Sequence, residues 1–221
     1  MDYQVNTTPL REQVYTYLRK QMNLGALIPG STINLGEIAK QLGISKTPLR
    51  DALIHLEIEG FVTILPRRGV RVNLLELRDV KNAYDTMGVI ETSIVLDCFE
   101  SISHSHISQL EELNNTMLSD IKKDDFNRLF DLNLQFHDVY LNVSDNDYLK
   151  KFIIPIKQRL YDFPRKNYIK VWEMRNCEEH QLFIDHLKAG SAKDAAKILK
   201  DVHWSFEFQE AFIKAFYNFD G

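Results

Sequence analysis

The sequence predicts a mostly α-helical protein made of two domains. Glycine and proline are frequent before residue 70, whereas neither occurs between Gly88 and Pro155. From Leu77 onward, apolar residues recur at helical spacing almost throughout. We therefore expect one domain in residues 1–76 and a second, all-α domain in residues 77–221.

The distribution of charge supports the same division. The formal net charge of −4 lacks the basic excess that nucleic-acid-binding proteins usually carry. Residues 1–76, however, have a net charge of +2, and the remaining residues have a net charge of −6. A basic first domain is compatible with DNA binding even though the whole chain is acidic.

Composition excludes several other classes of protein. A chain of 221 residues with 44% apolar residues can bury a core and is not typical of a disordered protein. Cys98 and Cys177 are too few for a disulfide framework or a cysteine metal cluster. Charged residues interrupt every apolar stretch before about 18 residues, and the first residues lack the pattern of a signal peptide. We expect a cytoplasmic protein without a membrane partner.

Capping signals delimit three helices in the first domain. Thr8 is predicted to cap the first helix, with Pro9 at its first position. Asn34 with Glu37 resembles a capping box at the start of the second helix, and Ser45 is predicted to cap the third. The expected ends of these helices are Gly25, Gly43 and Gly60.

The second and third of these helices have the lengths of a helix-turn-helix. In that motif the second helix enters the major groove, and Lys46, Thr47 and Arg50 lie at its N-terminal end. After it, the β-rich runs 61–65 and 70–72 flank a basic turn and predict a hairpin placed like a wing. This basic hairpin argues against the alternative, a small helical cap with a solvated basic face.

The second domain is predicted to be a bundle of antiparallel helices, because the connections between its helical segments are short. Six helices are expected, at residues 77–100, 106–122, 125–142, 146–162, 166–188 and 191–217. His104 and His106 are expected in a loop.

Three histidines of this bundle are predicted to face its core. His137 lies beside an apolar stripe on its helix together with Asn133, and His180 and His203 align with apolar residues on two other helices. Three buried imidazoles are costly unless they share a ligand, and imidazole suits zinc, nickel, copper or iron. The pattern alone leaves open the alternative that each is a separately hydrogen-bonded core histidine.

The first domain resembles the winged helix of GntR-type bacterial transcription regulators. Over residues 25–72 the resemblance includes the Pro-Gly turn, the S-x-T-P-x-R opening of the third helix, the L-x-x-E-G exit and the R-R-G-V wing. The DNA contacts that this resemblance implies are Lys46, Thr47, Arg50, Arg67, Arg68 and Gly69.

The second domain resembles the FCD effector domain of the FadR subfamily, in its shorter six-helix form. The matching segments are N-L-Q-F-H at 133–137, E-H-Q-L-F-I at 179–184 and A-K-I-L-K-D-V-H at 196–203. The metal ligands implied by the resemblance are Asn133, His137, His180 and His203. The expected metal is a divalent transition metal, with zinc or nickel favoured. Asn133 replaces the usual aspartate and removes a negative charge, so the metal is expected to bind less tightly than in relatives with the aspartate.

A second departure from the family concerns the effector. Met87 stands where many relatives have an arginine that lines the effector cavity. We expect Arg159 and Arg175, on helices flanking the site, to take over the binding of an effector such as an organic or sugar acid.

The resemblance predicts a ligand-responsive transcription regulator, a repressor, that binds a palindromic DNA operator as a homodimer. One alternative is a hydrolase that uses a metal on the three histidines. Against it, no inward Asp or Glu is expected as a general base, because Glu179 is predicted to point away from the site. The other alternative is a constitutive DNA-binding or scaffolding protein whose bundle only dimerises.

Overall fold

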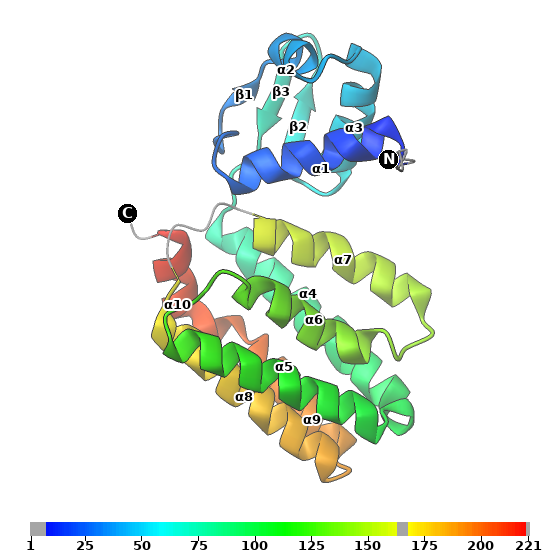
Figure 1. The fold of residues 1–221 in the computed structure, drawn as a ribbon, viewed down its shortest axis with the longest axis vertical. Coiled ribbons are helices and arrows are strands. Elements are labelled where there is room, and N and C mark those ends of the chain that lie inside the picture. Colours follow the sequence, from blue (N-terminus) through cyan, green and yellow to red (C-terminus); the bar gives the residue numbers. More distant parts are fainter. Residues whose placement is uncertain (1–7, 163–167, 220–221) are drawn as a thin grey trace, which may run out of the picture. The chain divides into compact units, whose positions relative to one another are not determined.

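The computed structural model describes residues 8–162 and 168–219, and it confirms the predicted fold class (Figure 1). The chain is mostly helical, with one small sheet near its N-terminus. It forms two compact units, the first comprising the residues up to Glu76 and the segment that starts at Gln158. The second comprises Leu77–Lys157 and the helices after residue 168.

The first unit contains three helices and a three-stranded antiparallel sheet in the order β1-β3-β2. β2 and β3 form the predicted hairpin, in which Leu65 pairs with Gly69. β1 pairs with β3 and was not predicted, because two residues are too few to show an alternating pattern. The elements are α1 (Leu10–Asn23), β1 (Thr32–Ile33), α2 (Leu35–Leu42), α3 (Lys46–Ile58), β2 (Val62–Leu65) and β3 (Gly69–Val72).

The helix caps agree only partly with the prediction. Asn34 caps α2, because its Oδ1 accepts hydrogen bonds from the backbone N–H groups of Gly36 and Glu37 at 3.0 and 3.2 Å. Ser45 occupies the cap position of α3 without a side-chain cap bond. The prediction for Thr8 is wrong by one residue, because Pro9 is the cap of α1 and its carbonyl accepts the first backbone hydrogen bonds of the helix.

The core of the first unit lies between α1, α3 and the sheet. The inner faces of α1 and α3 pack against each other, and the sheet contributes the inward side chains of β2 and β3. The buried apolar side chains here include Val14, Leu18, Leu49, Leu53, Leu56, Phe61, Val62, Val70 and Val72. This packing holds one face of α3 inside and leaves the other face exposed.

The second unit is the predicted helical bundle, in which α5 packs between α6 and α8 while α4 packs against α9 (Figure 1). A short 3-10 turn, Phe99–Ser101, follows α4. The helices are α4 (Leu77–Cys98), α5 (His104–Lys122), α6 (Leu129–Leu141), α7 (Asp147–Asp162), α8 (Lys170–Lys188), α9 (Ala192–Ile198) and α10 (Phe206–Tyr217). Among the described residues, no helix combines the length and the apolar character that crossing a bilayer requires.

Several predicted helix bounds in this unit are wrong. His104 and His106 lie in the first turn of α5 rather than in a loop, because Ser103 caps the helix together with His106. α6 begins at Leu129, four residues later than expected. The expected start of the next helix at residue 166 lies outside the described residues, and α8 begins at Lys170.

The last predicted helix, residues 191–217, is in fact two helices separated by a π-helical turn at Leu199–His203. α10 then starts after Ser205, whose hydroxyl accepts a hydrogen bond from the N–H of Phe208 at 3.3 Å. Apolar residues occupy both sides of this break, so their spacing alone did not reveal it. π-helical turns often mark functional positions, and this one carries His203.

The caps of α2 and α3 yield a test of the helix-turn-helix. Asn34→Ala removes two hydrogen bonds to backbone N–H groups and should lower the free energy of unfolding by about 1 kcal/mol. Ser45→Ala removes no side-chain cap bond and should cost clearly less. Urea denaturation of the two variants measures both changes, and equal losses would contradict this account of the caps.

Candidate metal centre and nucleic-acid interface

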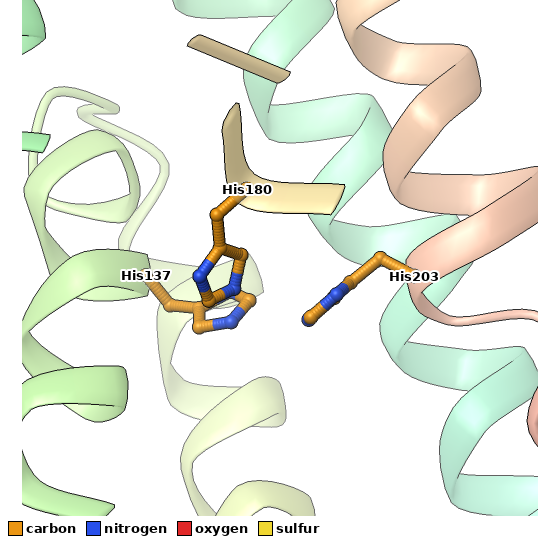
Figure 2. A group of neighbouring side chains, drawn as sticks. All are labelled: His137, His180 and His203. Atoms are coloured by element: carbon orange, nitrogen blue, oxygen red, sulfur yellow. The ribbon is translucent and has the colours of Figure 1, made fainter. Parts of the chain in front are cut away.

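The structure brings three of the four predicted metal ligands together. His137 comes from α6, His180 from α8 and His203 from the π-helical turn, and Figure 2 shows their rings directed toward one another. One ring nitrogen of each lies within 4.8 Å of the others. Their exposed fractions are 0%, 1% and 8%, so the cluster is inside the bundle.

Glu91 of α4 holds the ring of His137. Its Oε2 lies 3.0 Å from Nδ1 of His137 and accepts hydrogen bonds from the Tyr140 hydroxyl at 2.5 Å and from Nε1 of Trp204 at 2.7 Å. Because a carboxylate only accepts hydrogen bonds, Nδ1 of His137 carries the proton. The lone pair is therefore on Nε2, which is buried and has no hydrogen-bond partner among the described residues.

Glu179 of α8 holds the ring of His203 in the same way. Its Oε2 lies 3.0 Å from Nδ1 of His203, and its Oε1 accepts a hydrogen bond from Nε2 of Gln209 at 2.8 Å. Gln209, in α10, in turn accepts a hydrogen bond from Nε1 of Trp172 at 2.8 Å. Two histidines of the cluster thus have one ring nitrogen fixed by a buried carboxylate, an arrangement typical of metal-binding histidines.

His180 has a different environment. Its ring stacks on Phe136 with the centroids 3.9 Å apart and the planes 17° from parallel. Both ring nitrogens are buried, and neither has a hydrogen-bond partner among the described residues. A buried polar atom without a partner destabilises the folded state, so this ring fits a site in which a ligand satisfies it.

Burial keeps the imidazoles of His137 and His180 neutral. It lowers the pKa of His137 to about 4, although Glu91 acts in the opposite direction. Burial also lowers the pKa of His180 well below its usual value. Burial alone would raise the pKa of Glu91, but His137 and Tyr140 hold it at about 2. Neutral imidazole is the form that binds metals, so the donor set fits a divalent transition metal.

Sequence reasoning missed both carboxylates of this site, and its expectation that Glu179 points away is wrong. Glu179 is only 3% exposed, because α8 packs against neighbours on two sides and two adjacent positions can both face inward. Glu91 is fully buried on the same stripe of α4 as Met87 and Ile94, so helical spacing would have revealed it. Both carboxylates contact the Nδ1 side of a ring, a position that orients the histidines.

The other predicted residues of the bundle lie as follows. Asn133 is half-buried on α6, about one turn before His137 and on the same face. Arg175 lies on α8 with Nε 3.4 Å from Oε1 of Glu179 and its guanidinium 3.8 Å above the Phe208 ring. Arg159 lies near the end of α7, in the segment that groups with the first unit. The structure thus does not group Arg159 with the histidines.

The predicted DNA-contacting residues occupy two exposed places in the first unit. Lys46, Thr47 and Arg50 are exposed at the N-terminal end of α3. Arg67 and Arg68 are exposed in the turn between β2 and β3.

Gly69 follows this basic turn and has a φ of +98°. A Cβ at this position would lie 3.3 Å from Cγ2 of Thr32. The backbone conformation and the close approach of β1 therefore favour glycine directly after the two arginines.

Comparison with known proteins identifies the family. The family described as "Bacterial regulatory proteins, gntR family" matches residues 3–72, and the FCD domain matches residues 82–202. The chain belongs to the GntR family and carries an FCD domain. The names of the family and of the relatives are those of transcription regulators.

Individual relatives support this assignment. The transcriptional repressor RspR of Escherichia coli is 27% identical over 146 residues, 66% of this chain and 64% of RspR. The chain thus matches somewhat less than two thirds of the length of RspR. The Nta operon transcriptional regulator of Aminobacter aminovorans is 30% identical over 81% of this chain and 84% of its own. The structure of Escherichia coli McbR/YncC covers 97% of this chain and 100% of its own, with 22% identity and a TM-score of 0.72, which shows the shared fold.

The buried histidines make the stability of the metal-free protein depend on pH. His137 has a pKa of about 4 in the folded protein and about 6.5 when unfolded, so the unfolded chain binds the extra proton first as the pH falls. Stability should therefore decrease from about pH 6.5 downward, with a loss of roughly 3 kcal/mol from this group once the pH is below 4.

Urea denaturation between pH 7.5 and 5 measures this dependence. The matched variant His55→Gln changes an exposed histidine and should keep the wild-type slope. His137→Phe should reduce the slope to the part that buried His180 contributes. A free energy of unfolding that stays constant over this range would contradict the assignment of a neutral, buried His137.

Proposed function

We propose that this regulator is a ligand-responsive repressor of the cytoplasm that binds a palindromic operator as a homodimer. Its bundle is proposed to bind a divalent metal, zinc or nickel, through Asn133, His137, His180 and His203. The convergence of three buried imidazoles carries this proposal, because Nε2 of His137 and both ring nitrogens of His180 have no hydrogen-bond partner among the described residues. A scaffold without a ligand site has no need for such a costly cluster.

The proposed metal would lie on the ring nitrogens of His137 and His203 that do not contact Glu91 and Glu179, together with one ring nitrogen of His180. Because three imidazoles and one amide are neutral ligands, they would not reduce the positive charge of the ion. A further oxygen ligand could then bind to the metal. A small organic or sugar acid fits that position as the effector. The effector is proposed to act by binding one conformation of the regulator more tightly than another.

From the sequence, Arg159 and Arg175 are proposed to bind the effector. The contacts of Arg175 with Glu179 and Phe208 also favour a role in holding the histidine site.

The winged helix is proposed to read DNA through Lys46, Thr47 and Arg50, with Arg67, Arg68 and Gly69 at the wing. The exposed N-terminal end of α3 supports this, because hydroxyl and cationic groups there suit phosphates and the acceptor atoms of guanine. A single winged helix contacts few bases, so a dimer on two half-sites supplies the specificity.

The DNA-binding role predicts a large effect at Arg50. Arg50→Ala should weaken operator binding about 5- to 100-fold at constant salt, because a base contact or a phosphate contact is lost. Fluorescence anisotropy measures the affinity, with a DNA duplex that the wild-type protein selects from a random pool.

Arg78→Ala is the matched control, since it removes the same charge from an exposed position on α4. It should bind the selected duplex like the wild type. Wild-type affinity for Arg50→Ala as well would rule out α3 as the recognition helix.

The metal site predicts a difference between two neighbouring glutamates of α8. Glu179→Gln weakens the bond that orients His203 and should lower metal affinity about 10- to 100-fold. Glu178→Gln, at an exposed position, should leave it unchanged. Competition with a chelating dye measures the affinity for zinc and nickel.

His180→Ala extends the same test to a ligand and should remove stoichiometric metal. Unchanged metal content in this variant, measured by elemental analysis of the purified protein, would contradict the proposed site and favour a regulator whose bundle only dimerises.

A further inference from the structure

Lys157 of α7 is a buried cation in the bundle. It is 4% exposed, and it is the one lysine or arginine among the described side chains that is buried. Lysine is rarely buried without a partner, because removing its ammonium group from water is costly. Its position therefore calls for a compensating negative group.

The partner that the structure supplies is weak. Nζ of Lys157 lies 3.4 Å from Oδ1 of Asp138, a long distance for a hydrogen bond between charged groups. The Asp138 side chain is 55% exposed, so water screens its charge. An ammonium group has three donors, and this contact uses only one of them.

The charge of Lys157 also influences the histidine cluster. Asp138, which it contacts, directly follows His137 in α6. The positive charge of Lys157 acts on both His137 and Glu91. The buried cation thus belongs to the surroundings of the proposed metal site.

The other candidates for an anion-binding group are less suitable. Met87, at the position where the sequence departs from its relatives, is fully buried and apolar. Arg175 already contacts the Glu179 carboxylate and the Phe208 ring. Arg159 lies in the segment that groups with the first unit, whereas Lys157 belongs to the second.

The charges around the site favour a monoanion. Glu91, Glu179 and Asp138 supply three negative charges. A divalent ion, Lys157 and Arg175 would supply four positive charges, so one positive charge is in excess. A carboxylate supplies one negative charge, accepts hydrogen bonds from an ammonium group and is itself a ligand for zinc or nickel.

We propose that Lys157 is the residue that binds the carboxylate group of the effector in this regulator. This inference rests on the proposed metal and effector site, and it assigns the recognition of the anion to α7. The ligand class is a small monocarboxylate or an acid that presents one carboxylate to this end of the site.

The test compares Lys157→Met with Lys151→Met, which changes an exposed lysine of the same helix. Methionine suits a buried position, so Lys157→Met should fold, and its unfolding midpoint without anion provides the baseline. The probes are sodium acetate, lactate and succinate, with sodium phosphate as a second anion class and sodium chloride to match ionic strength. The thermal unfolding midpoint of metal-loaded protein is measured against the concentration of each anion.

We expect carboxylates to raise the midpoint of the wild type and of Lys151→Met. For Lys157→Met the apparent dissociation constant should be about 10- to 100-fold higher, as for the loss of one charge-assisted hydrogen bond. Its metal content should equal that of the wild type. This combination separates binding of the anion from binding of the metal.

Each other outcome has a definite meaning. Equal carboxylate affinity in Lys157→Met and the wild type would overturn the inference, as would a response to phosphate alone or to no anion. A loss of carboxylate binding in Arg175→Met but not in Lys157→Met would assign the anion to Arg175 instead. A wild-type protein that binds no metal would contradict the proposed function itself, and elemental analysis of the same samples shows this independently.

Discussion

The three imidazoles inside the helical bundle impose the constraint on which the rest of the second unit depends. All three residues are buried, and burial keeps the rings of His137 and His180 neutral. Such rings are tolerated only if their nitrogen atoms find partners. Glu91 and Glu179 supply partners for two Nδ1 atoms, and the remaining nitrogens converge on one place. The same physical requirement explains both the buried carboxylates and the proposed metal.

This constraint links several helices. Nε1 of Trp204 donates to Glu91, so the residue after the π-helical turn is tied to α4. Gln209 joins α10 to α8 through Glu179 and Trp172. The positions of the histidine rings therefore depend on the packing of α4, α8 and α10 as well as on the helices that carry them. A change at the histidines acts on the same polar contacts that hold these helices together.

Much of this arrangement could be predicted from the sequence, because local rules govern it. Helical spacing identified the inward faces of His137, His180 and His203, and the Asn34 cap marked the start of α2. The π-helical turn was missed because apolar residues continue through it, and Glu179 was missed because one helix can bury two faces. Lys157 lies four residues after Ile153 and three before Leu160, so helical spacing alone places it on the buried face of α7. It was missed because lysine is rarely buried.

X-ray absorption spectroscopy of the purified protein loaded with zinc or nickel tests the central claim most directly, because the fine structure reports the atoms around the metal. The account predicts multiple scattering from three imidazole rings, with the remaining ligands being oxygen at the distances typical of amide, carboxylate or water. A metal surrounded by oxygen atoms alone would contradict the claim that the buried histidines form its site.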